Sequence, residues 1–419
     1  MFVNGPTAHI LDQFVATFGN ARPKRLGIAV SGGSDSLGLL VLARQWAAQG
    51  GPEPHAVTVD HGLRAGSGDE AAGVAALCAR LGVAHTTLEW RGWDGAGNLP
   101  DQARRARYGL IADWAEAGQI SDVALGHTLN DVAETFVMRL MREAGVDGLA
   151  AMAPGWRQGA VEFRRPLLQV SRVELRALLD REGLAWVDDP TNEDETFERV
   201  RVRKALAALE DLGVTARGLG RVARHLGEVR RTLYWYVFVE ARKYVTFDRG
   251  DVLIERKGFR TLPRDICRRM VQEVLRWISG AEYGPRGKAV DLVLEAIRGG
   301  NGMTLHGVMM SVGSDHLRFT REPKAVAELR AAPGKAWDGR WQLDGPWPEG
   351  AEVAALGEAG LAQCEDRVRP GLPRASLLAS PAVWRGGHLV AAPLAGFADG
   401  WSATLLRDEE LFFASILAH

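Results

Sequence analysis

Two hydrophobic periods alternate along the first half of the chain. Short apolar runs, typical of buried strands, lie at residues 26–30, 55–60, 85–90 and 122–126. Apolar residues recur every three or four positions, as in amphipathic helices, over residues 7–18, 35–48, 69–81, 102–117 and 131–142. Strands that alternate with helices predict a parallel sheet covered by helices on both faces. Such sheets bind ligands at the carboxyl ends of their strands.

The pattern changes after Lys204. Residues 205–242 have a helical period and many arginines, and further helices are predicted over 263–279 and 288–298. An Ala-Ala-Pro-Gly segment at 331–334 predicts a linker, and the residues beyond it contain short β-like runs. We therefore predict three domains: an α/β parallel-sheet nucleotide-binding catalytic domain, a mostly helical, basic middle domain and a small β-rich C-terminal domain. Their predicted bounds are 1–210, 211–325 and 335–419.

Composition excludes several classes of protein. The 419 residues carry a net charge of −1, so any nucleic-acid site must concentrate its positive charge locally. The first residues have no signal-peptide pattern, and no apolar run approaches the roughly 18–20 residues of a membrane span. The three cysteines, Cys78, Cys267 and Cys364, are far apart and form no C-x-x-C pair. This favours a reduced cytoplasmic protein and argues against an iron–sulfur or persulfide-using enzyme.

The most informative segment is the loop Ser31-Gly32-Gly33-Ser34-Asp35-Ser36 between the first predicted strand and its helix. The N–H groups of a first helical turn and the helix dipole favour an anion at such a turn. The glycines allow close approach of the backbone to a ligand, and the serine hydroxyls add donors. The loop fits neither the Walker nor the dinucleotide-binding pattern. A carboxylate beside phosphates needs a divalent cation between them, so Asp35 predicts Mg²⁺.

Two further motifs are expected at the same edge of the sheet. Asp60 and His61 end the second predicted strand. Arg104, Arg107 and Tyr108 share one face of the helix over 102–117, and two guanidinium groups on one face can bind a phosphate.

The segment from Gly126 to Thr135 opens another helix at a strand end. Asp131 and Glu134 share a face of this helix and, with Asp35, predict an oxygen-rich Mg²⁺ site. His127 lies at its start. Farther along, an acidic turn that contains Asp188 and Asp189 precedes a basic run over 199–204. This pairing suits a site that holds an ammonium group beside a polyanion.

The loop at 31–36 resembles the S-G-G-x-D-S signature of the PP-loop ATP pyrophosphatases, which cleave ATP to AMP and pyrophosphate. With the later motifs, residues 25–204 resemble the bacterial tRNA(Ile)-lysidine synthetases. That family shows, in this order, D-H-x-L-R, A-R-x-x-R-Y, H-x-x-D-D-x-x-E-T, W-x-x-D-P-T-N and R-N-R-I-R. The corresponding segments here begin at Asp60, Ala103, His127, Trp186 and Arg199. Two departures are Asn130 in place of the first Asp of the D-D pair and Val200 in place of Asn.

The resemblance implies an enzyme that adenylates C2 of the wobble cytidine in the minor isoleucine tRNA with a CAU anticodon. Free L-lysine then attacks C2 through its ε-amine, AMP leaves, and lysidine remains. The loop residues Ser31, Gly32, Gly33, Ser34, Asp35 and Ser36 would bind ATP.

Further site assignments follow from the same resemblance. Asp35 and Asp131 would bind Mg²⁺, and Arg104 and Arg107 would stabilise the adenylated base. His127 is the candidate for removing a proton from the amine. Asp188 or Asp189 is the candidate for holding the substrate's ammonium group, and Trp93 and Trp156 are candidate stacking surfaces for tRNA bases.

Two alternatives stay open. One is another PP-loop ligase or amidotransferase that acts on a small molecule. The other is a non-catalytic RNA-binding protein that retains a nucleotide-binding fold. The sequence favours neither a monomer nor an oligomer and predicts no association with membranes.

Overall fold

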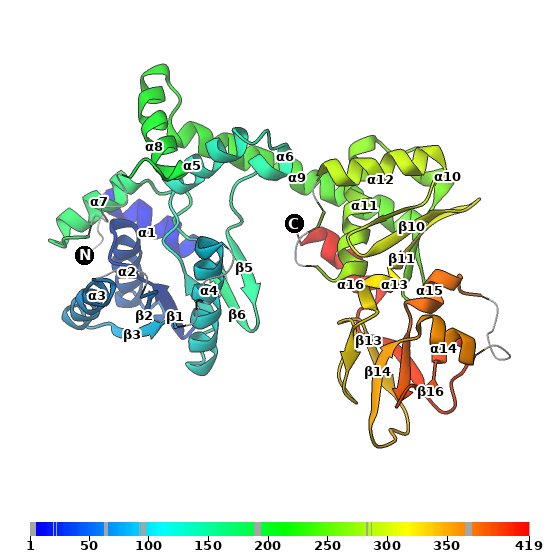
Figure 1. The fold of residues 1–419 in the computed structure, drawn as a ribbon. Coiled ribbons are helices and arrows are strands. Elements are labelled where there is room, and N and C mark those ends of the chain that lie inside the picture. Colours follow the sequence, from blue (N-terminus) through cyan, green and yellow to red (C-terminus); the bar gives the residue numbers. More distant parts are fainter. Residues whose placement is uncertain are drawn as a thin grey trace. The chain divides into compact units, whose positions relative to one another are not determined.

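The apolar runs of the first half form one sheet (Figure 1). The computed structural model describes residues 6–19, 21, 23–62, 66–91, 93, 98–187, 194–281, 284–285, 287–364 and 371–418. The chain divides into two compact units, Met1–Val229 and Arg230–His419. The sheet of the first unit has the strand order β3-β2-β1-β4-β6-β5, and only β5 is antiparallel to its neighbour. The strands are β1 Arg25–Ala29, β2 Glu53–Asp60, β3 Ala84–Glu89, β4 Asp122–Ala124, β5 Gly155–Gln158 and β6 Val161–Arg164.

Helices cover both faces of this sheet because successive strand residues point to opposite sides. On one face, Ile28 of β1 shares a core with Leu40 of α2, Cys78 of α3 and Leu175 of α7. On the other face, Ile111 of α4 packs with residues of β2, β4 and β6. These helices and α1 span Pro6–Ala16 (α1), Ser34–Ala48 (α2), Ser67–Leu81 (α3), Leu99–Ala117 (α4) and Arg172–Arg181 (α7).

A smaller group of helices completes the first unit. Val132 and Phe136 of α5 pack against Ala223 of α9. Helix α9 is continuous and contributes residues to both units. These elements span Leu129–Leu140 (α5), Val146–Leu149 (α6), Glu198–Leu209 (α8), Glu210–Leu212 (η2) and Ala216–Tyr244 (α9).

The second unit contains a five-stranded antiparallel sheet that the hydrophobic pattern did not predict. Its strand order is β7-β8-β11-β10-β9, and α11 and α12 pack against it. The elements are β7 Val245–Asp248, β8 Asp251–Glu255, α10 Arg256–Phe259, α11 Arg264–Ser279, α12 Gly287–Gly299, β9 Met303–Leu305, β10 Val308–Val312, β11 His316–Arg321 and α13 Pro323–Val326.

The end of the chain forms two small antiparallel sheets, β12-β14-β15-β16 and β13-β17. The last helix, α16, returns to the preceding region, where Phe412 and Ile416 are buried in the core around α11. Residues 331–334 were predicted as a linker, but Ala331 belongs to β12, which pairs with β14. The elements are β12 Arg330–Ala331, β13 Trp341–Asp344, β14 Ala351–Ala355, α14 Gly357–Gln363, α15 Arg374–Leu378, β15 Pro381–Arg385, β16 His388–Ala391, η3 Pro393–Ala395, β17 Ser402–Leu405 and α16 Glu409–Leu417.

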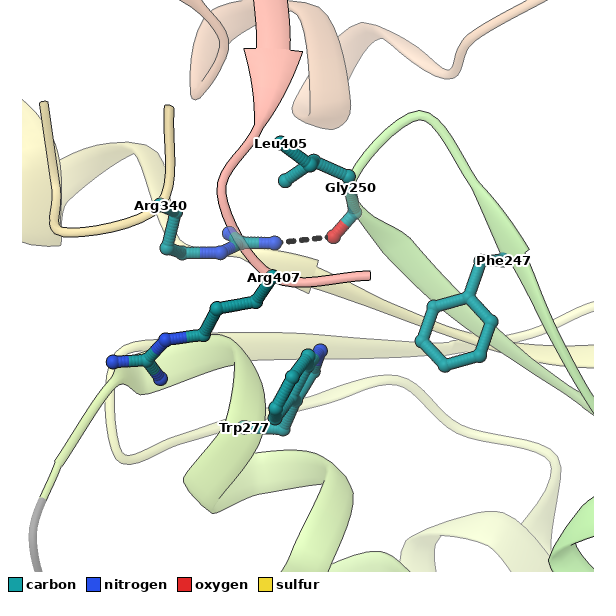
Figure 2. A pocket seen from close by; sticks show the side chains of 6 residues that line it. All are labelled: Phe247, Gly250, Trp277, Arg340, Leu405 and Arg407. Carbon is teal, nitrogen blue, oxygen red and sulfur yellow. Dashed lines mark hydrogen bonds between the residues drawn. The ribbon is translucent and has the colours of Figure 1, made fainter. Parts of the chain in front are cut away.

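A small cavity in the second unit is lined by Phe247, Gly250, Trp277, Arg340, Leu405 and Arg407. Figure 2 shows the Arg340 guanidinium donating to the carbonyl oxygen of Gly250, at 2.5 Å, with Arg407 beside the ring of Trp277. Burial lowers the pKa of Arg340 to about 10, so its guanidinium stays charged at neutral pH. None of the predicted site residues lines this cavity.

The predicted fold class is confirmed. Each predicted strand and helix of the first half appears within a few residues of its predicted bounds. A capping box of Ser171 and Glu174 opens α7. The cysteines are free and buried. No helix in the described part of the chain has the length and apolar character needed to cross a membrane. The three-domain division stays a prediction.

Candidate active site

The loop at Ser31–Ser36 joins the end of β1 to the start of α2. Gly32 has a φ of +85°, a conformation that side chains disfavour. The hydroxyl of Ser36 accepts from the N–H of Ser31 at 3.1 Å and donates to the carbonyl of Gly33 at 3.0 Å, so it fixes the loop. Gly33 is the N-cap of α2 and has no side chain to occupy the N–H groups of the first turn. These groups are therefore suited to bind an anion.

Close packing holds the neighbouring strand end against this loop. Strands β2, β1 and β4 are adjacent and parallel, so Asp60, the loop and Gly126 lie at the same edge of the sheet. A Cβ atom on Gly126 would lie 3.2 Å from the backbone carbonyl of Asp35. A side chain here would force the Asp35 backbone to shift by a few tenths of an ångström, so glycine favours this close approach.

Asp35 forms a two-pronged ion pair with Arg172, a residue outside the predicted site. The Nε atom of Arg172 lies 3.2 and 3.1 Å from the two carboxylate oxygens of Asp35, and a terminal nitrogen lies 2.9 Å from Oδ2. Both side chains are 19% exposed. Burial opposes the charge of Arg172, but the bonds and charge of Asp35 outweigh it, so the pKa of Arg172 is raised.

Asp131 and Glu134 form a second set of ion pairs in which α5 meets α8. Arg199 lies 2.9 Å from Oδ1 of Asp131 and 2.6 Å from Oε2 of Glu134. Arg203 lies 2.9 Å from the other oxygen of Glu134. Burial of Asp131 disfavours its charge, but Arg199, the Thr128 N–H and Arg172 more than compensate, so the pKa of Asp131 is lowered.

Arg172 connects the two sets of ion pairs. Its terminal nitrogens lie 4.0 Å from Oδ1 of Asp131 and 3.8 Å from Oε1 of Glu134. The predicted juxtaposition of Asp35 with Asp131 and Glu134 is thus present, with a guanidinium group among the three carboxylates. Val200, one of the two departures, is buried while Arg199 and Arg203 on either side reach the acids.

The same geometry tests whether the residues fit Mg²⁺. No group of three or more His, Cys, Asp and Glu side chains that could hold a metal ion occurs among the described residues. Mg²⁺ in ATP-using enzymes usually takes only one or two carboxylates and completes its shell with phosphate oxygens and water. Asp35 and Asp131 lie on either side of the Arg172 guanidinium, beside the loop at Ser31–Ser36, which is called the phosphate loop below after the anion it is predicted to bind. The two carboxylates therefore fit a magnesium ion held in this way.

Asn130 has a structural role, which explains why an asparagine can stand where the family motif has an aspartate. Its Oδ1 accepts a hydrogen bond of 2.8 Å from the backbone N–H of Arg172, which places the first residue of α7. An aspartate at this position could accept the same bond, so the position requires an acceptor rather than a charge.

We therefore expect Asn130→Asp to keep most of the activity and Asn130→Ala to lose much more, because only alanine leaves the N–H of Arg172 without its acceptor. The loss of one such bond is worth about 1 kcal/mol, or roughly a fivefold change in nucleotide affinity if binding requires the placement of Arg172. Calorimetric titration with an ATP analogue measures this change. Equal affinities for the two variants would contradict the assigned role.

His127 lies at the start of the loop before α5 and is neutral at pH 7. Burial, together with the charges of Arg165, Arg104 and Arg199, lowers its pKa to about 4. Its Nδ1 atom is buried and has no hydrogen-bond partner within the described structure. The imidazole is therefore neutral but weakly basic, and the predicted role of His127 in proton removal stays a prediction.

This low pKa predicts a loss of stability in acid. The unfolded chain, in which the histidine has a pKa near 6.5, binds more protons than the folded chain as the pH falls from 6.5 towards 4. The His127 contribution to folding is therefore present above pH 6.5 and is lost below it. We expect His127→Gln to be less sensitive to acid in this range, as measured by urea unfolding at several pH values. Parallel losses in both proteins would contradict the low pKa.

The three arginines of α4 have different surroundings. Arg105 pairs with Asp101 at 3.0 Å on an exposed part of the helix. Arg107 donates to Nε2 of His61 at 3.0–3.1 Å, which joins the motif that begins at Asp60 to the motif that begins at Ala103. Arg104 lies over the ring of Tyr108, 5.1 Å from its centre.

Arg165 is a further cation near Arg104, and the sequence analysis did not single it out. It lies over the ring of Trp156, 4.4 Å from its centre, and Trp156 also stacks on Phe163. Trp156 is therefore covered by protein groups, which disfavours its predicted role as a stacking surface. Arg104, Arg107 and Arg165 have no carboxylate partner among the described residues.

Some predicted residues lie outside the described part of the chain. They include Leu63 and Arg64, from the motif that begins at Asp60. They also include Asp188, Asp189 and the rest of the acidic turn. Val187, the last described residue before that turn, donates its N–H to the carbonyl of Gly32 at 3.1 Å. The described start of this motif, Val187, therefore lies against the loop at Ser31–Ser36. Trp93 is 45% exposed, and its role as a stacking surface stays a prediction.

Comparison with known proteins agrees with this geometry. Residues 6–210 match a family model described as the PP-loop domain. The chain is 49% identical to the tRNA(Ile)-lysidine synthase of Ruegeria pomeroyi over 410 residues, which cover 98% of each chain. It is 36% identical to the tRNA(Ile)-lysidine synthase of a Bradyrhizobium species over 322 residues, 71% of this chain and 90% of that one.

Among solved structures, the U34-tRNA thiolase NcsA from Methanococcus maripaludis matches with 18% identity and a TM-score of 0.46. The match covers 53% of this chain and 80% of the thiolase. The 49% identity to the Ruegeria enzyme is the decisive finding, because the match extends over nearly the whole chain. It includes the phosphate loop, helix α5 with Asp131 and Glu134, and the second unit. The chain belongs to the tRNA(Ile)-lysidine synthase family.

Proposed function

We propose that this protein ligates L-lysine to C2 of the wobble cytidine in the minor isoleucine tRNA with a CAU anticodon, using ATP and releasing AMP and pyrophosphate. The codon read would change from AUG to AUA. The observation that carries the proposal is the phosphate loop with Asp35 at the start of α2, in a chain that matches a tRNA(Ile)-lysidine synthase over nearly its whole length. We further propose that it acts in the cytoplasm.

The loop and the acids would place ATP. The first-turn N–H groups of α2 would bind the β- and γ-phosphates, and Asp35 and Asp131 would hold Mg²⁺. Bound magnesium would neutralise charge on the phosphates during transfer of the adenylyl group. Gly32 and Gly126 support this assignment, because both allow the backbone to approach closely at this edge of the sheet.

The arginines without carboxylate partners would stabilise the activated base. Arg104 and Arg107 lie on one face of α4, and Arg165 lies near Arg104. Mutual repulsion among such cations is relieved by an anion, which suits the phosphate of the adenylated cytidine.

His127 would take a proton from the ε-amine of lysine, since an unperturbed amine is protonated at pH 7. Burial and the neighbouring arginines lower the pKa of His127 in the ligand-free protein, so this role requires that a bound anion offset the arginine charges and raise the basicity of the imidazole. Asp188 or Asp189 would hold the substrate's ammonium group. This assignment is supported by the tether between Val187 and Gly32, which brings the preceding segment to the phosphate loop.

The rest of the chain would hold the tRNA. Arginines recur along α9, at positions 217, 221, 224, 230, 231 and 242, and such residues bind phosphates without reading sequence. Exposed aromatic residues, Trp235 and Tyr236, lie on the same helix and would stack on unpaired bases.

The test is incorporation of labelled lysine into the CAU-anticodon isoleucine tRNA by purified protein with ATP and Mg²⁺. Lysine should enter the tRNA with release of one AMP per lysidine formed. A methionine tRNA with the same anticodon serves as the control substrate. Pyrophosphate release that needs a small acceptor and no RNA would contradict the proposal and favour a small-molecule ligase.

A further inference from the structure

Among the described residues, the ion-pair cluster beside the phosphate loop contains equal numbers of acidic and basic groups. Asp35, Asp131 and Glu134 carry three negative charges, and Arg172, Arg199 and Arg203 carry three positive charges within 4.0 Å of them. Arg199 and Arg203 approach from α8, whereas Arg172 approaches from α7 and is the one of these three arginines that contacts Asp35. The guanidinium of Arg172 therefore contacts both acids of the predicted metal site, Asp35 and Asp131.

The backbone of Arg172 is fixed in three ways. The capping box of Ser171 and Glu174 begins α7 at this residue. Asn130 accepts its N–H at 2.8 Å. Leu175 packs so closely on α2 that a Cβ atom at Gly38 would lie 2.9 Å from it. Any rearrangement at this site must therefore come from the long side chain of Arg172 and not from its helix.

We propose that Arg172 is an internal counter-ion that prevents Asp35 and Asp131 from binding a divalent cation by themselves, and that it moves to the phosphates when the cation arrives with ATP. This inference rests on the proposed use of Mg²⁺ and ATP. A free cation would have to displace the guanidinium of Arg172 from Asp35. It would also add positive charge to a cluster whose described charges already balance. Magnesium that arrives with a polyphosphate brings the anion that Arg172 requires as its new partner.

This role predicts opposite effects on two ligands. Without the guanidinium, the carboxylates of Asp35 and Asp131 are free for a metal, so Arg172→Gln should bind Mn²⁺ alone roughly tenfold more tightly than the natural protein. Without its contact to the phosphates, the same variant should bind a non-hydrolysable ATP analogue with Mg²⁺ roughly tenfold more weakly. A residue that only supports the fold would weaken both ligands.

The metal measurement uses electron paramagnetic resonance of free Mn²⁺ with the full chain, and the nucleotide measurement uses calorimetry. Arg181→Gln, on an exposed part of the same helix, is the matched control and should change neither affinity. In the double variant Arg172→Gln and Asp35→Asn, the gain in Mn²⁺ affinity should disappear. Arg172→Lys, which keeps the charge, should bind Mn²⁺ no more tightly than the natural protein.

Unchanged Mn²⁺ affinity in Arg172→Gln, or weaker binding of both ligands, would overturn the proposal. Circular dichroism of each variant shows whether the fold is retained, and the lysine variant gives a second test if the glutamine variant unfolds. The assays contain neither tRNA nor lysine. Failure of lysine incorporation would therefore count against the proposed function and not against the role of Arg172.

Discussion

Replacing Asp35 with asparagine is expected to slow lysidine formation by at least about a hundredfold, an effect comparable to the removal of a preorganised electrostatic group from an active site. Asparagine keeps the shape of the side chain but removes the charge that would hold Mg²⁺ beside the phosphates. It also deprives Arg172 of the carboxylate that it contacts at 2.9–3.2 Å. The single-turnover rate of labelled-lysine incorporation measures the effect.

Asp113→Asn is the control for this experiment, because Asp113 is an exposed carboxylate of α4 outside the ion-pair cluster. Its rate should match that of the natural protein. If Asp35→Asn remained fully active, the assigned mechanism would be wrong, and a non-catalytic origin of the nucleotide fold would gain support.

The second large effect concerns stability. Glu134→Gln is expected to lower the free energy of unfolding by about 3 kcal/mol, the lower end of the cost of breaking a buried ion pair. The Glu134 side chain is 2% exposed, and its two oxygens pair with Arg199 and Arg203. These arginines are 42% and 35% exposed, and solvent around them reduces the penalty of leaving them unpaired. Urea unfolding monitored by circular dichroism measures the change.

An ion pair between the turn after α5 and the first residue of α8 provides the comparison. Arg142 and Glu198 form a pair in which Arg142 is 63% exposed. Surface pairs contribute roughly 0–1 kcal/mol, so Glu198→Gln should have little effect on stability. Equal destabilisation by the two substitutions would show that burial does not determine the strength of these pairs.

Local sequence signals were sufficient for the first unit's framework. The apolar runs and helical periods determined the strands and helices around the loop, because a buried parallel strand and an amphipathic helix each have a distinct spacing of apolar residues. The β5–β6 hairpin was not predicted. β6 alternates apolar and polar residues over only four positions, and β5 is only half-buried, so both signals are too short to predict strands.

The second unit shows the same limit on a larger scale. Its five-stranded sheet joins strands of three to six residues, and its core is completed by Phe412 and Ile416 from the end of the chain. Contacts between such distant positions leave no periodic signal in either segment.

The sequence by itself determined the phosphate loop, the acids Asp35 and Asp131 and the family to which the chain belongs, because these depend on residue types at short, fixed spacings. Only the tertiary structure decided which cations meet those acids. Arg172 is 137 positions from Asp35 along the chain and reaches it only because α7 packs on α2. Its local sequence does not distinguish Arg172 from other helical arginines, and only long-range packing makes it the partner of Asp35.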